Sequence, residues 1–341
     1  MKPALPRIAA EWSLGFSAVL VGFAAPASAQ TLSAIYVMKL ESGEVRKVSH
    51  HDELWLGSPA WSHDGKRLLY DAAPANRNYR QGRIMLENLA PADKAEAGRG
   101  RPTLHFKEDK AEAGRGRPAL HFKEAEASEV KDLGYGCAPV WSADDKQVAF
   151  QLGQGNAAGE RPGVYVMNVD GQGREWICEG QRPRWSPDGE KLLVASQHEG
   201  FASLYIYDIF EAKLTRVLEH GYEQVVGGCW SPDGKRLAFV GYKGAAAFSG
   251  GRGELAVVEA AAGQTPQPLV EDRVGWQPDW SPDGKRLLGW IASGGQERLH
   301  LFDVDGLEEP ALLAGQVGAH NSDAVFSPDG KWIAFDSVRG E

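Results

Sequence analysis

Three features of the 341-residue sequence predict an all-β fold, a six-bladed β-propeller with four-stranded antiparallel blades. One phrase resembling Trp-Ser-Pro-Asp-Gly-Lys occurs six times, and a period of about 40–50 residues is typical of propellers. The 41 Gly, 19 Pro and 11 Trp favour tight turns, short strands and a repeated aromatic anchor over a helical bundle. With 43% hydrophobic and 24% charged residues, the chain has enough apolar content for a sizeable core, which excludes a disordered protein.

The six copies of the phrase begin at regularly spaced aromatic residues, the anchors. The copies are WSHDGKRLLY from Trp61, WSADDKQVAF from Trp141, WSPDGEKLLV from Trp185, WSPDGKRLAF from Trp230, WSPDGKRLLG from Trp280 and FSPDGKWIAF from Phe326. Consecutive anchors lie 44 to 50 residues apart, except for the 80 residues between the first two.

Each copy is typical of a tight β-hairpin. Pro presets the φ angle of the turn, Asp bonds its own backbone two residues on, and Gly adopts the left-handed conformation. In the second copy Gly is replaced by Asp145, a residue type that tolerates this conformation. We therefore expect the anchor to pack between blades and the turn Asp to be structural rather than a ligand.

Further strand-like runs complete each blade. They follow the hairpins at 163–167 and 175–178 in the second repeat, and at 203–208 and 213–218 in the third. Together with the strand before the anchor they give four strands per repeat. The last copy stops after strands at 323–327 and 331–337, whereas two strand-like runs at 34–39 and 44–48 precede the first copy. We expect the last blade to be built from both ends of the chain, which closes the ring.

The 80-residue gap contains a tandem duplication. Residues 93–108 and 109–124 differ only at Thr103 and Ala119, and no extra hairpin phrase lies between the first two anchors. We therefore expect one long blade in which a single Leu-His-Phe-Lys unit, 104–107 or 120–123, forms the outer strand and the other copy forms a loop.

The first 29 residues resemble a signal peptide of the Sec type. Lys2 and Arg7 precede an apolar stretch at 14–25, and Ala27-Ser28-Ala29 fits the cleavage pattern. Cleavage would leave a propeller at 30–341, periplasmic or secreted, without a membrane span. The leader carries one net positive charge, so the formal charge of −9 becomes −10 in the mature chain. An acidic surface without a basic stripe argues against nucleic acid as a partner.

The repeated phrase, followed by strands such as Leu-Tyr-Ile-Tyr-Asp at 204–208, resembles the WD-like propeller repeat of the TolB family. The resemblance covers essentially the whole mature chain, but the additional N-terminal domain of that family has no counterpart between residue 29 and the first repeat. Propellers of prolyl-oligopeptidase-like and dipeptidyl-peptidase-like enzymes share the repeat, although this chain has no G-x-S-x-G elbow. Oligogalacturonate-lyase-like enzymes use related propellers, so the fold does not decide the function.

The segments that enter the innermost strands are expected to line the mouth of the central channel, where propellers bind ligands. The candidate binding residues in them are Trp55, Tyr135, Arg182, Arg184, Tyr222, Trp276, Asp279, His320 and Asp323. We expect the four aromatic side chains to act as apolar anchors for a partner segment and the two arginines to pair with its carboxylates. The alternative is that these loops are merely solvated and that the aromatic rings cover the core.

A metal-dependent carbohydrate-active enzyme is the second hypothesis. His50, His51 and His320 belong to the first and last repeats, which ring closure makes neighbours, and carboxylates are close to them in sequence. Such a set suits Mn, Zn or Fe, but the side chains of a His-His dipeptide point to opposite faces of an extended strand. We therefore favour a monomeric, non-enzymatic scaffold without a cofactor or catalytic residues, which binds an envelope protein or peptide segment at the channel mouth.

The three cysteines are too few for a disulfide scaffold. Cys137 and Cys229 precede anchors, whereas Cys178 belongs to an outer strand. Because the inner and outer strands of a blade lie three sheet spacings of about 4.8 Å apart, they are too far apart for a disulfide. We expect three unpaired, mostly buried thiols.

Overall fold

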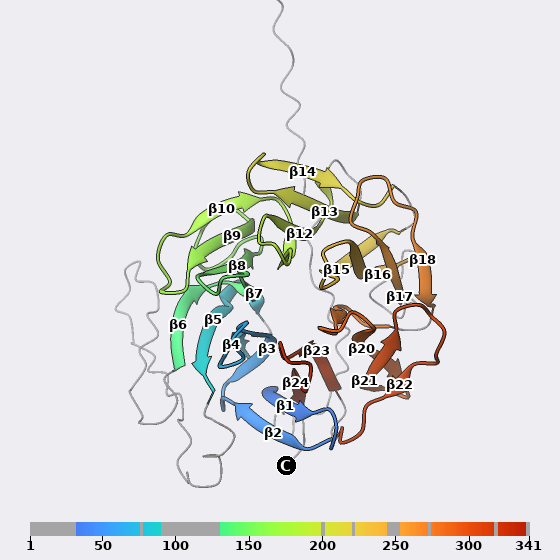
Figure 1. Ribbon diagram of the computed structural model, residues 1–341. Helices are drawn as coiled ribbons and strands as arrows, with labels where there is room; N and C mark the ends of the chain where they lie inside the picture. The colour runs from blue at the N-terminus through green and yellow to red at the C-terminus, as the bar shows by residue number, and fades with distance from the viewer. Residues whose placement is uncertain are drawn as a thin grey trace, which may run out of the picture.

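The computed structural model describes residues 32–75, 78–89, 130–198, 202–219, 222–243, 253–271, 274–316 and 320–338. These residues form six four-stranded antiparallel sheets around a common centre (Figure 1). The predicted six-bladed β-propeller is therefore confirmed. The expected signal peptide at 1–29 and the duplicated insertion at 93–124 lie outside the described residues.

The blades are numbered along the chain, and the strands of each are given from the ring centre outward. Blade 1 is β3 (Leu54–Trp61), β4 (Arg67–Pro74), β5 (Arg83–Asn88) and β6 (Val130–Tyr135), with the short 3-10 helix η1 (Tyr79–Gln81) before β5. Blade 2 is β7 (Cys137–Trp141), β8 (Gln147–Leu152), β9 (Gly163–Asn168) and β10 (Glu175–Cys178). Blade 3 is β11 (Gln181–Trp185), β12 (Lys191–Ser196), β13 (Ser203–Asp208) and β14 (Lys213–Arg216).

The second half of the ring has the same plan. Blade 4 is β15 (Gln224–Trp230), β16 (Arg236–Tyr242), β17 (Gly253–Glu259) and β18 (Gln267–Val270). Blade 5 is β19 (Asp279–Trp280), β20 (Arg286–Ser293), β21 (Gln296–Asp303) and β22 (Ala311–Leu312). Blade 6 is β23 (His320–Phe326), β24 (Trp332–Val338), β1 (Ala34–Lys39) and β2 (Val45–Ser49).

Blade 6 closes the ring with strands from both ends of the chain, as predicted. Strand β1 pairs with β24 along its whole length, from Ala34 opposite Ser337 to Lys39 opposite Trp332. Figure 1 shows the blue and dark red strands side by side in one blade.

The prediction for the outer strand of blade 1 is wrong. The strand that pairs with β5 is β6 (Val130–Tyr135), not a Leu-His-Phe-Lys unit of the duplicated segment. Because β6 lies after the whole duplication, the Val-Lys-Asp-Leu run at 130–133 supplies the alternating strand that the sequence analysis placed further upstream.

The hairpin phrase folds identically in all six blades. In each, the serine hydroxyl donates to the turn aspartate over 2.5 to 2.8 Å, and it accepts a bond from the backbone N–H five residues further on. The serine bond is the main cause that lowers the pKa of each turn carboxyl. The expectation that this aspartate is structural is therefore confirmed.

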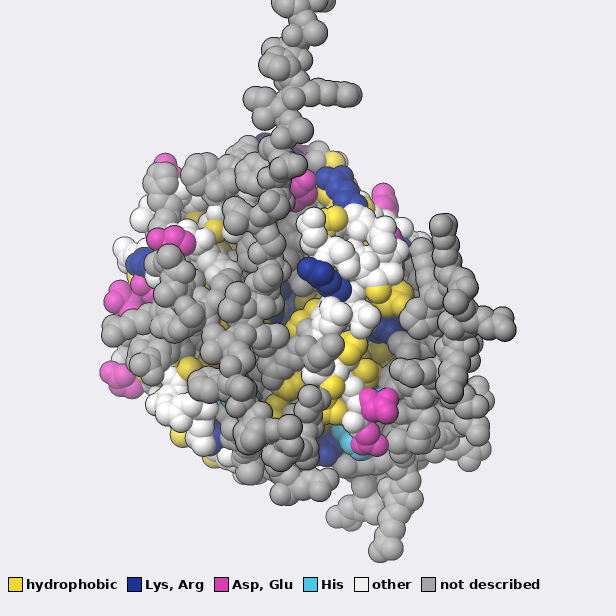
Figure 2. Space-filling view, turned by 180° about the vertical axis from the view of Figure 1, so that it is seen from behind, with side chains coloured by type: hydrophobic (Ala, Val, Ile, Leu, Met, Phe, Trp, Pro, Cys, Tyr) yellow, Lys and Arg dark blue, Asp and Glu magenta, His cyan; other side chains and the backbone are white. Residues whose placement is uncertain are grey.

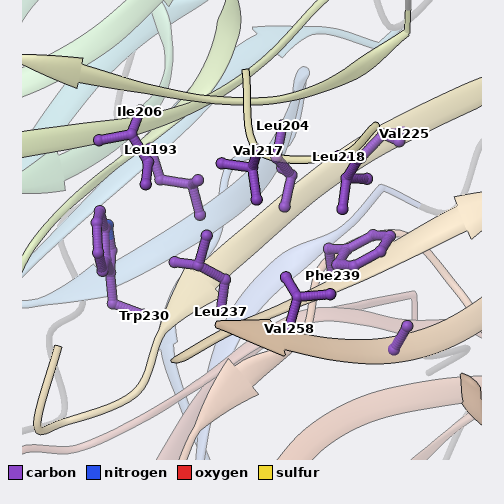
Figure 3. Packing of buried hydrophobic residues seen from close by; sticks show 11 residues of the cluster. Leu193, Leu204, Ile206, Val217, Leu218, Val225, Trp230, Leu237, Phe239 and Val258 are labelled. Atoms are coloured by element: carbon purple, nitrogen blue, oxygen red, sulfur yellow. The ribbon is translucent and has the colours of Figure 1, made fainter. Parts of the chain in front are cut away.

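Hydrophobic side chains fill the six interfaces between neighbouring blades, one buried cluster for each. Figure 3 shows the cluster between blades 3 and 4, where Leu193, Leu204 and Ile206 of blade 3 face Leu237 and Phe239 of blade 4. Burial of this kind is the main force that holds blade to blade.

The anchor residues pack between blades, as predicted. Trp141 donates its indole N–H to the carbonyl of Ala60 in the preceding blade over 3.1 Å, and Trp230 does the same to the carbonyl of Arg184. The guanidinium of Arg67 lies 4.4 Å from the centre of the Trp141 ring, which is a cation–π distance.

Two departures from the hairpin phrase meet across the interface between blades 1 and 2. His63 stands where Pro is usual and Asp145 stands where Gly is usual. The His63 backbone N–H donates to both Asp145 carboxylate oxygens over 3.0 Å, and its Nδ1 lies 2.8 Å from Oδ1. Asp145 has a φ of 56°, as the sequence suggested. Since Pro has no N–H, the two substitutions form a complementary pair.

All three cysteines are buried and unpaired, as predicted. Burial raises the pKa of the Cys178 thiol to about 12 and raises the pKa values of Cys137 and Cys229 well above their ordinary range. The thiols are therefore neutral and unreactive.

Candidate functional site: a ring of side chains in the central channel

The innermost strands share an irregularity three residues before the anchor. The residues at this position, which we call the channel ring, are Ser58, Ala138, Arg182, Gly227, Gln277 and Asp323. Pairing with the second strand shifts register here in five of the blades. Four of these residues, all non-glycine, have φ values of 45–50°. Such bulges redirect side chains and are frequent beside binding sites.

The side chain of Arg182 crosses the channel. Its Nη1 donates to Oε1 of Gln277 in blade 5 over 2.5 Å and lies 3.7 Å from Oδ1 of Asp323 in blade 6. The guanidinium also lies 5.4 Å from the centre of the Trp276 ring. Since Arg182 belongs to blade 3, these contacts show that the ring residues of distant blades meet at the centre.

In blades 1 and 2, the second strand supports the ring residue of the next blade. Asp71 on β4 accepts a 2.8 Å hydrogen bond from the backbone N–H of Ala138, and Gln151 on β8 accepts one from the N–H of Arg182. Both acceptors lie ten residues after their anchors. The bonds satisfy N–H groups that the bulge removes from the sheet ladder.

Three carboxylates gather on one side of the channel. Asp71 and Asp336 are 2% and 4% exposed, and Asp323 is in charge interaction with both. Burial, reinforced by Asp323, raises the pKa of Asp71 to about 6 and raises the pKa of Asp336 well above its ordinary value. Hydroxyl groups bind two of them: Ser58 donates to Asp323 over 3.3 Å and Ser322 donates to Asp336 over 3.0 Å.

A second charged pair lies one residue before the anchors. Burial raises the pKa of Asp279 to about 6, opposed by a 2.8 Å hydrogen bond from the Phe326 N–H and by the charge of Arg184. Burial also lowers the pKa of the Arg184 guanidinium, and the charge of Asp279 opposes that change. The channel therefore holds charged groups at two levels.

Figure 2 shows the molecule from behind, so that the end of the ring facing away from the viewer in Figure 1 is visible. Among the described residues near its centre, hydrophobic and uncharged side chains predominate, and a few Lys or Arg, acidic and His side chains lie beside them.

The structure brings five of the nine predicted site residues together in two groups. Arg182, Trp276 and Asp323 meet at the level of the channel ring. Arg184 and Asp279 form the charged pair at the second level. These five residues are the predicted part of the candidate site.

Two predicted aromatic anchors, Tyr135 and Tyr222, lie elsewhere, and this part of the prediction is wrong. Trp55, by contrast, is 8% exposed, and its indole lies near the Asp71 carboxylate, since a Cβ at Gly57 would be 3.8 Å from Trp55 Nε1 and 3.3 Å from Asp71 Oδ1. Tyr135 is the last residue of the outer strand β6, where the Arg83 guanidinium stacks 4.5 Å from its ring centre. Tyr222 packs edge-on against Phe239 in the core between blades 3 and 4. For Tyr135 and Tyr222, the alternative that the rings cover the core holds.

The histidines proposed as metal ligands have other contacts. Nδ1 of His320 lies 3.4 Å from Oε2 of Glu297, and Nδ1 of the buried His51 accepts a hydrogen bond from the backbone N–H of Glu53. His50 lies in the connection between β2 and β3. Within the described parts of the chain, no group of three or more His, Cys, Asp or Glu side chains is arranged to hold a metal ion.

Four residues of the site were not predicted from the sequence. They are Ser58, Asp71, Gln277 and Asp336. A signal for them exists in the repeat alignment, because they occupy fixed offsets of −3 or +10 from an anchor. Polar residues at offsets where other blades carry Ala, Gly or Val mark the channel.

Comparison with known proteins finds no matching family model. The chain is 28% identical over 195 residues to an uncharacterised protein of Agrobacterium fabrum, covering 55% of this chain and 62% of the relative. It is 31% identical over 209 residues to an uncharacterised peptidase of Bacillus subtilis, covering 58% of this chain and 29% of the relative. It is also 31% identical over 81 residues to the Tol-Pal system protein TolB of Anaeromyxobacter, covering 22% of this chain and 18% of the relative. The chain thus spans less than two thirds of the curated relatives that it matches.

Solved structures match over nearly the whole chain. A putative TolB from Agrobacterium tumefaciens superposes with a TM-score of 0.61 at 19% identity, over 91% of this chain and 99% of that one. The fold is a TolB-like six-bladed β-propeller. TolB from Acinetobacter baumannii superposes with a TM-score of 0.56 at 17% identity, over 92% of this chain and 66% of that one.

The TolB-like propeller contains no helix, among its described residues, that is long and apolar enough to cross a bilayer.

Proposed function

We propose that this TolB-like propeller is a non-enzymatic scaffold that binds a peptide or protein segment at the mouth of its central channel. The observation that carries the proposal is the channel ring itself. Arg182 and Asp323 are held at positive φ and keep about a sixth of their side-chain surface exposed. Residues held at positive φ are frequent at binding sites, and two of the four in this ring, Arg182 and Asp323, are charged.

The chemistry of the ring suits an extended segment. Arg182 offers guanidinium donors, Asp323 offers an acceptor, and Trp276 provides a partly buried aromatic surface. A central aromatic and arginine cluster surrounded by polar groups is typical of binding hot spots.

The envelope setting of this proposal rests on the leader-like sequence at 1–29 and on the likeness to proteins named TolB. We propose that the mature chain acts in the periplasm or outside the cell, as a monomer, on a protein or peptide partner.

The proposal is tested by selecting peptides from a displayed random library on the purified mature protein. A double variant, Trp276→Ala with His320→Ala, removes apolar and polar surface near the mouth but leaves the Arg182 bonds in place. The matched control, Phe210→Ala with Leu307→Ala, removes two side chains that are 80% and 85% exposed in the β13–β14 and β21–β22 connections. In antiparallel blades these connections lie at the other end of the ring.

We expect peptides that bind the parent and the control with equal affinity and bind the mouth variant at least tenfold more weakly. The control should melt within a degree of the parent, whereas the mouth variant, which loses the packing of Trp276 against the core between blades 4 and 5, should keep a cooperative transition at a lower temperature, and binding is compared below both transitions. Failure to select any peptide, or equal binding to all three proteins, would contradict a binding mouth at this end.

A further inference from the structure

Asp71 and Asp336 occupy the same place in two neighbouring blades. Each lies ten residues after its anchor, on the second strand of blade 1 or blade 6, and each is buried. Blade 2 has Gln151 at this offset. The neutral amide of Gln151 accepts a hydrogen bond from the backbone N–H of Arg182, just as the Asp71 carboxylate accepts one from that of Ala138. An uncharged side chain is therefore sufficient for this bond, and the bond does not require a negative charge.

Asp336 has fewer hydrogen-bond donors than an ionised carboxylate needs. The Ser322 hydroxyl donates to its Oδ2 over 3.0 Å, whereas its Oδ1 is buried and has no partner among the described residues. The Ser58 hydroxyl donates to Asp323 over 3.3 Å and also lies beside Asp71, but a hydroxyl has only one proton to donate. A buried acceptor without a donor costs free energy, and more so when it is charged. A proton on Oδ1 would remove the charge and turn the unmet acceptor into a donor.

The charges around Asp336 also favour its protonated form. Burial is the main cause that raises its pKa well above the ordinary value, and three carboxylates that face it add to this effect: Asp323 on β23, Glu297 on β21 and Asp71 on β4. The nearby cations lie against other carboxylates, since Arg182 is 3.7 Å from Asp323 and Nδ1 of His320 is 3.4 Å from Glu297. Neighbouring carboxylates in a poorly solvated site do not all ionise, and one of them keeps a proton.

We propose that Asp336 stays protonated on Oδ1 in the folded protein at neutral pH, and that this proton makes the closure of the ring sensitive to alkaline pH. Asp336 belongs to β24, which pairs with β1 and packs against β3 of blade 1. Loss of the proton would place a charge beside Asp323 in the same blade and beside Asp71 across the interface. The inference does not depend on the proposed function.

The direction of the pH effect follows from the proton balance of folding at Asp336. In the unfolded chain this carboxyl ionises at about pH 4, so between pH 6 and pH 8 folding takes up one proton at this site. The folding equilibrium constant of the parent therefore falls about tenfold for each pH unit on account of Asp336. The stability that depends on this proton is present at low pH and is lost as the pH rises.

The test compares urea unfolding of the parent, Asp336→Asn and Asp305→Asn at pH 6, 7 and 8. Asn is neutral, resembles a protonated Asp in shape, and keeps an oxygen for the Ser322 hydroxyl. Asp305→Asn removes the same charge from an exposed carboxyl in the β21–β22 connection.

We expect the folding constant of Asp336→Asn, divided by that of the parent, to rise about tenfold per pH unit, whereas Asp305→Asn should run parallel to the parent. Parallel pH profiles for the parent and Asp336→Asn would overturn the proposal.

A second measurement detects the proton directly and does not depend on the stability of a variant. At pH 7.5 the infrared spectrum of the parent should contain the C=O stretching band of a protonated carboxyl group, and the band should be missing from Asp336→Asn. A parent without this band would overturn the proposal even if the variant did not fold.

Hydrogen exchange of backbone amides locates the effect. Between pH 6 and pH 8 the amides of β1 in the parent should lose protection relative to those of β13 in blade 3, and Asp336→Asn should abolish this difference. An equal loss in both blades would refute the assignment to the closing blade.

Discussion

Replacement of Asp71 by Asn tests the energetic cost of the channel carboxylates. Burial raises the pKa of Asp71 from 3.8 to about 6, so the ionised form opposes folding. An acid whose pKa is higher in the folded chain takes up protons on folding. Its destabilising effect is therefore absent below pH 4, grows between pH 4 and pH 6, and is complete above pH 6.

A shift of about two pKa units corresponds to about 3 kcal/mol at 1.36 kcal/mol per unit. The Asn side chain keeps an oxygen for the Ala138 N–H, but its buried NH₂ group needs an acceptor, which takes back about 1 kcal/mol. We therefore expect Asp71→Asn to raise the free energy of unfolding by about 2 kcal/mol at pH 7.5 and to change it little at pH 4.

The assay is urea unfolding followed by tryptophan fluorescence at both pH values, with Asp305→Asn as the control for net charge. The reasoning would be refuted by a variant that is less stable than the parent at pH 7.5, since this would mean that the Asp71 charge is fully compensated. A gain of equal size at pH 4 would also refute it, because the effect would then not come from ionisation.

Three further predictions concern the blade interfaces and metal dependence. In a double-mutant cycle, His63→Pro and Asp145→Gly should each destabilise the protein while the double variant approaches the parent, with a coupling energy of about 1–2 kcal/mol in urea unfolding; strict additivity would show that the contact contributes nothing. Leu237→Ala should cost about 2–5 kcal/mol, because this side chain is fully buried between blades 3 and 4, and a loss below 1 kcal/mol would contradict the packing. Chelation with EDTA should change neither the melting temperature nor peptide binding, and a drop of several degrees would instead favour the metal-dependent alternative.

The hairpins and the ring closure could be predicted from sequence because their chemistry is local and repeated. The Ser-x-Asp contacts of Ser186 and Asp188 involve residues two apart, so one phrase specifies one turn six times. Closure followed from counting strands, since the runs at 34–39 and 44–48 supply what the last repeat lacks.

The orientation of side chains near the channel could not be predicted in the same way. In five of the six blades a bulge in the innermost strand shifts its register by one residue, and such a shift exchanges the two faces of a strand. Trp276 and Trp55 lie four and six residues before their anchors. Trp276 approaches Arg182, whereas Trp55 is 8% exposed and lies near Asp71. Composition alone does not distinguish them.

The outer strand of blade 1 was misplaced for a different reason. The duplicated segment repeats a short apolar unit, and both copies compete with the run at 130–135 for one position in the sheet. Only pairing with β5, in which Arg83 faces Tyr135, decides among them.

The pairing of β1 with β24 makes the two ends of the described chain neighbours, because Ala34 lies opposite Ser337. This contact spans about 300 residues, and closing such a loop costs about 5 kcal/mol of chain entropy. Each of the other five blades can assemble from contacts within one repeat. In blade 6, however, β1 and β2 can join a four-stranded sheet only after β24 has folded, so the last step of folding is cooperative. In a circular permutant that joins Val338 to Ala34 and begins at His320, blade 6 would consist of consecutive hairpins. The native contacts would be the same, but the sequence separation between β1 and β24 would be small.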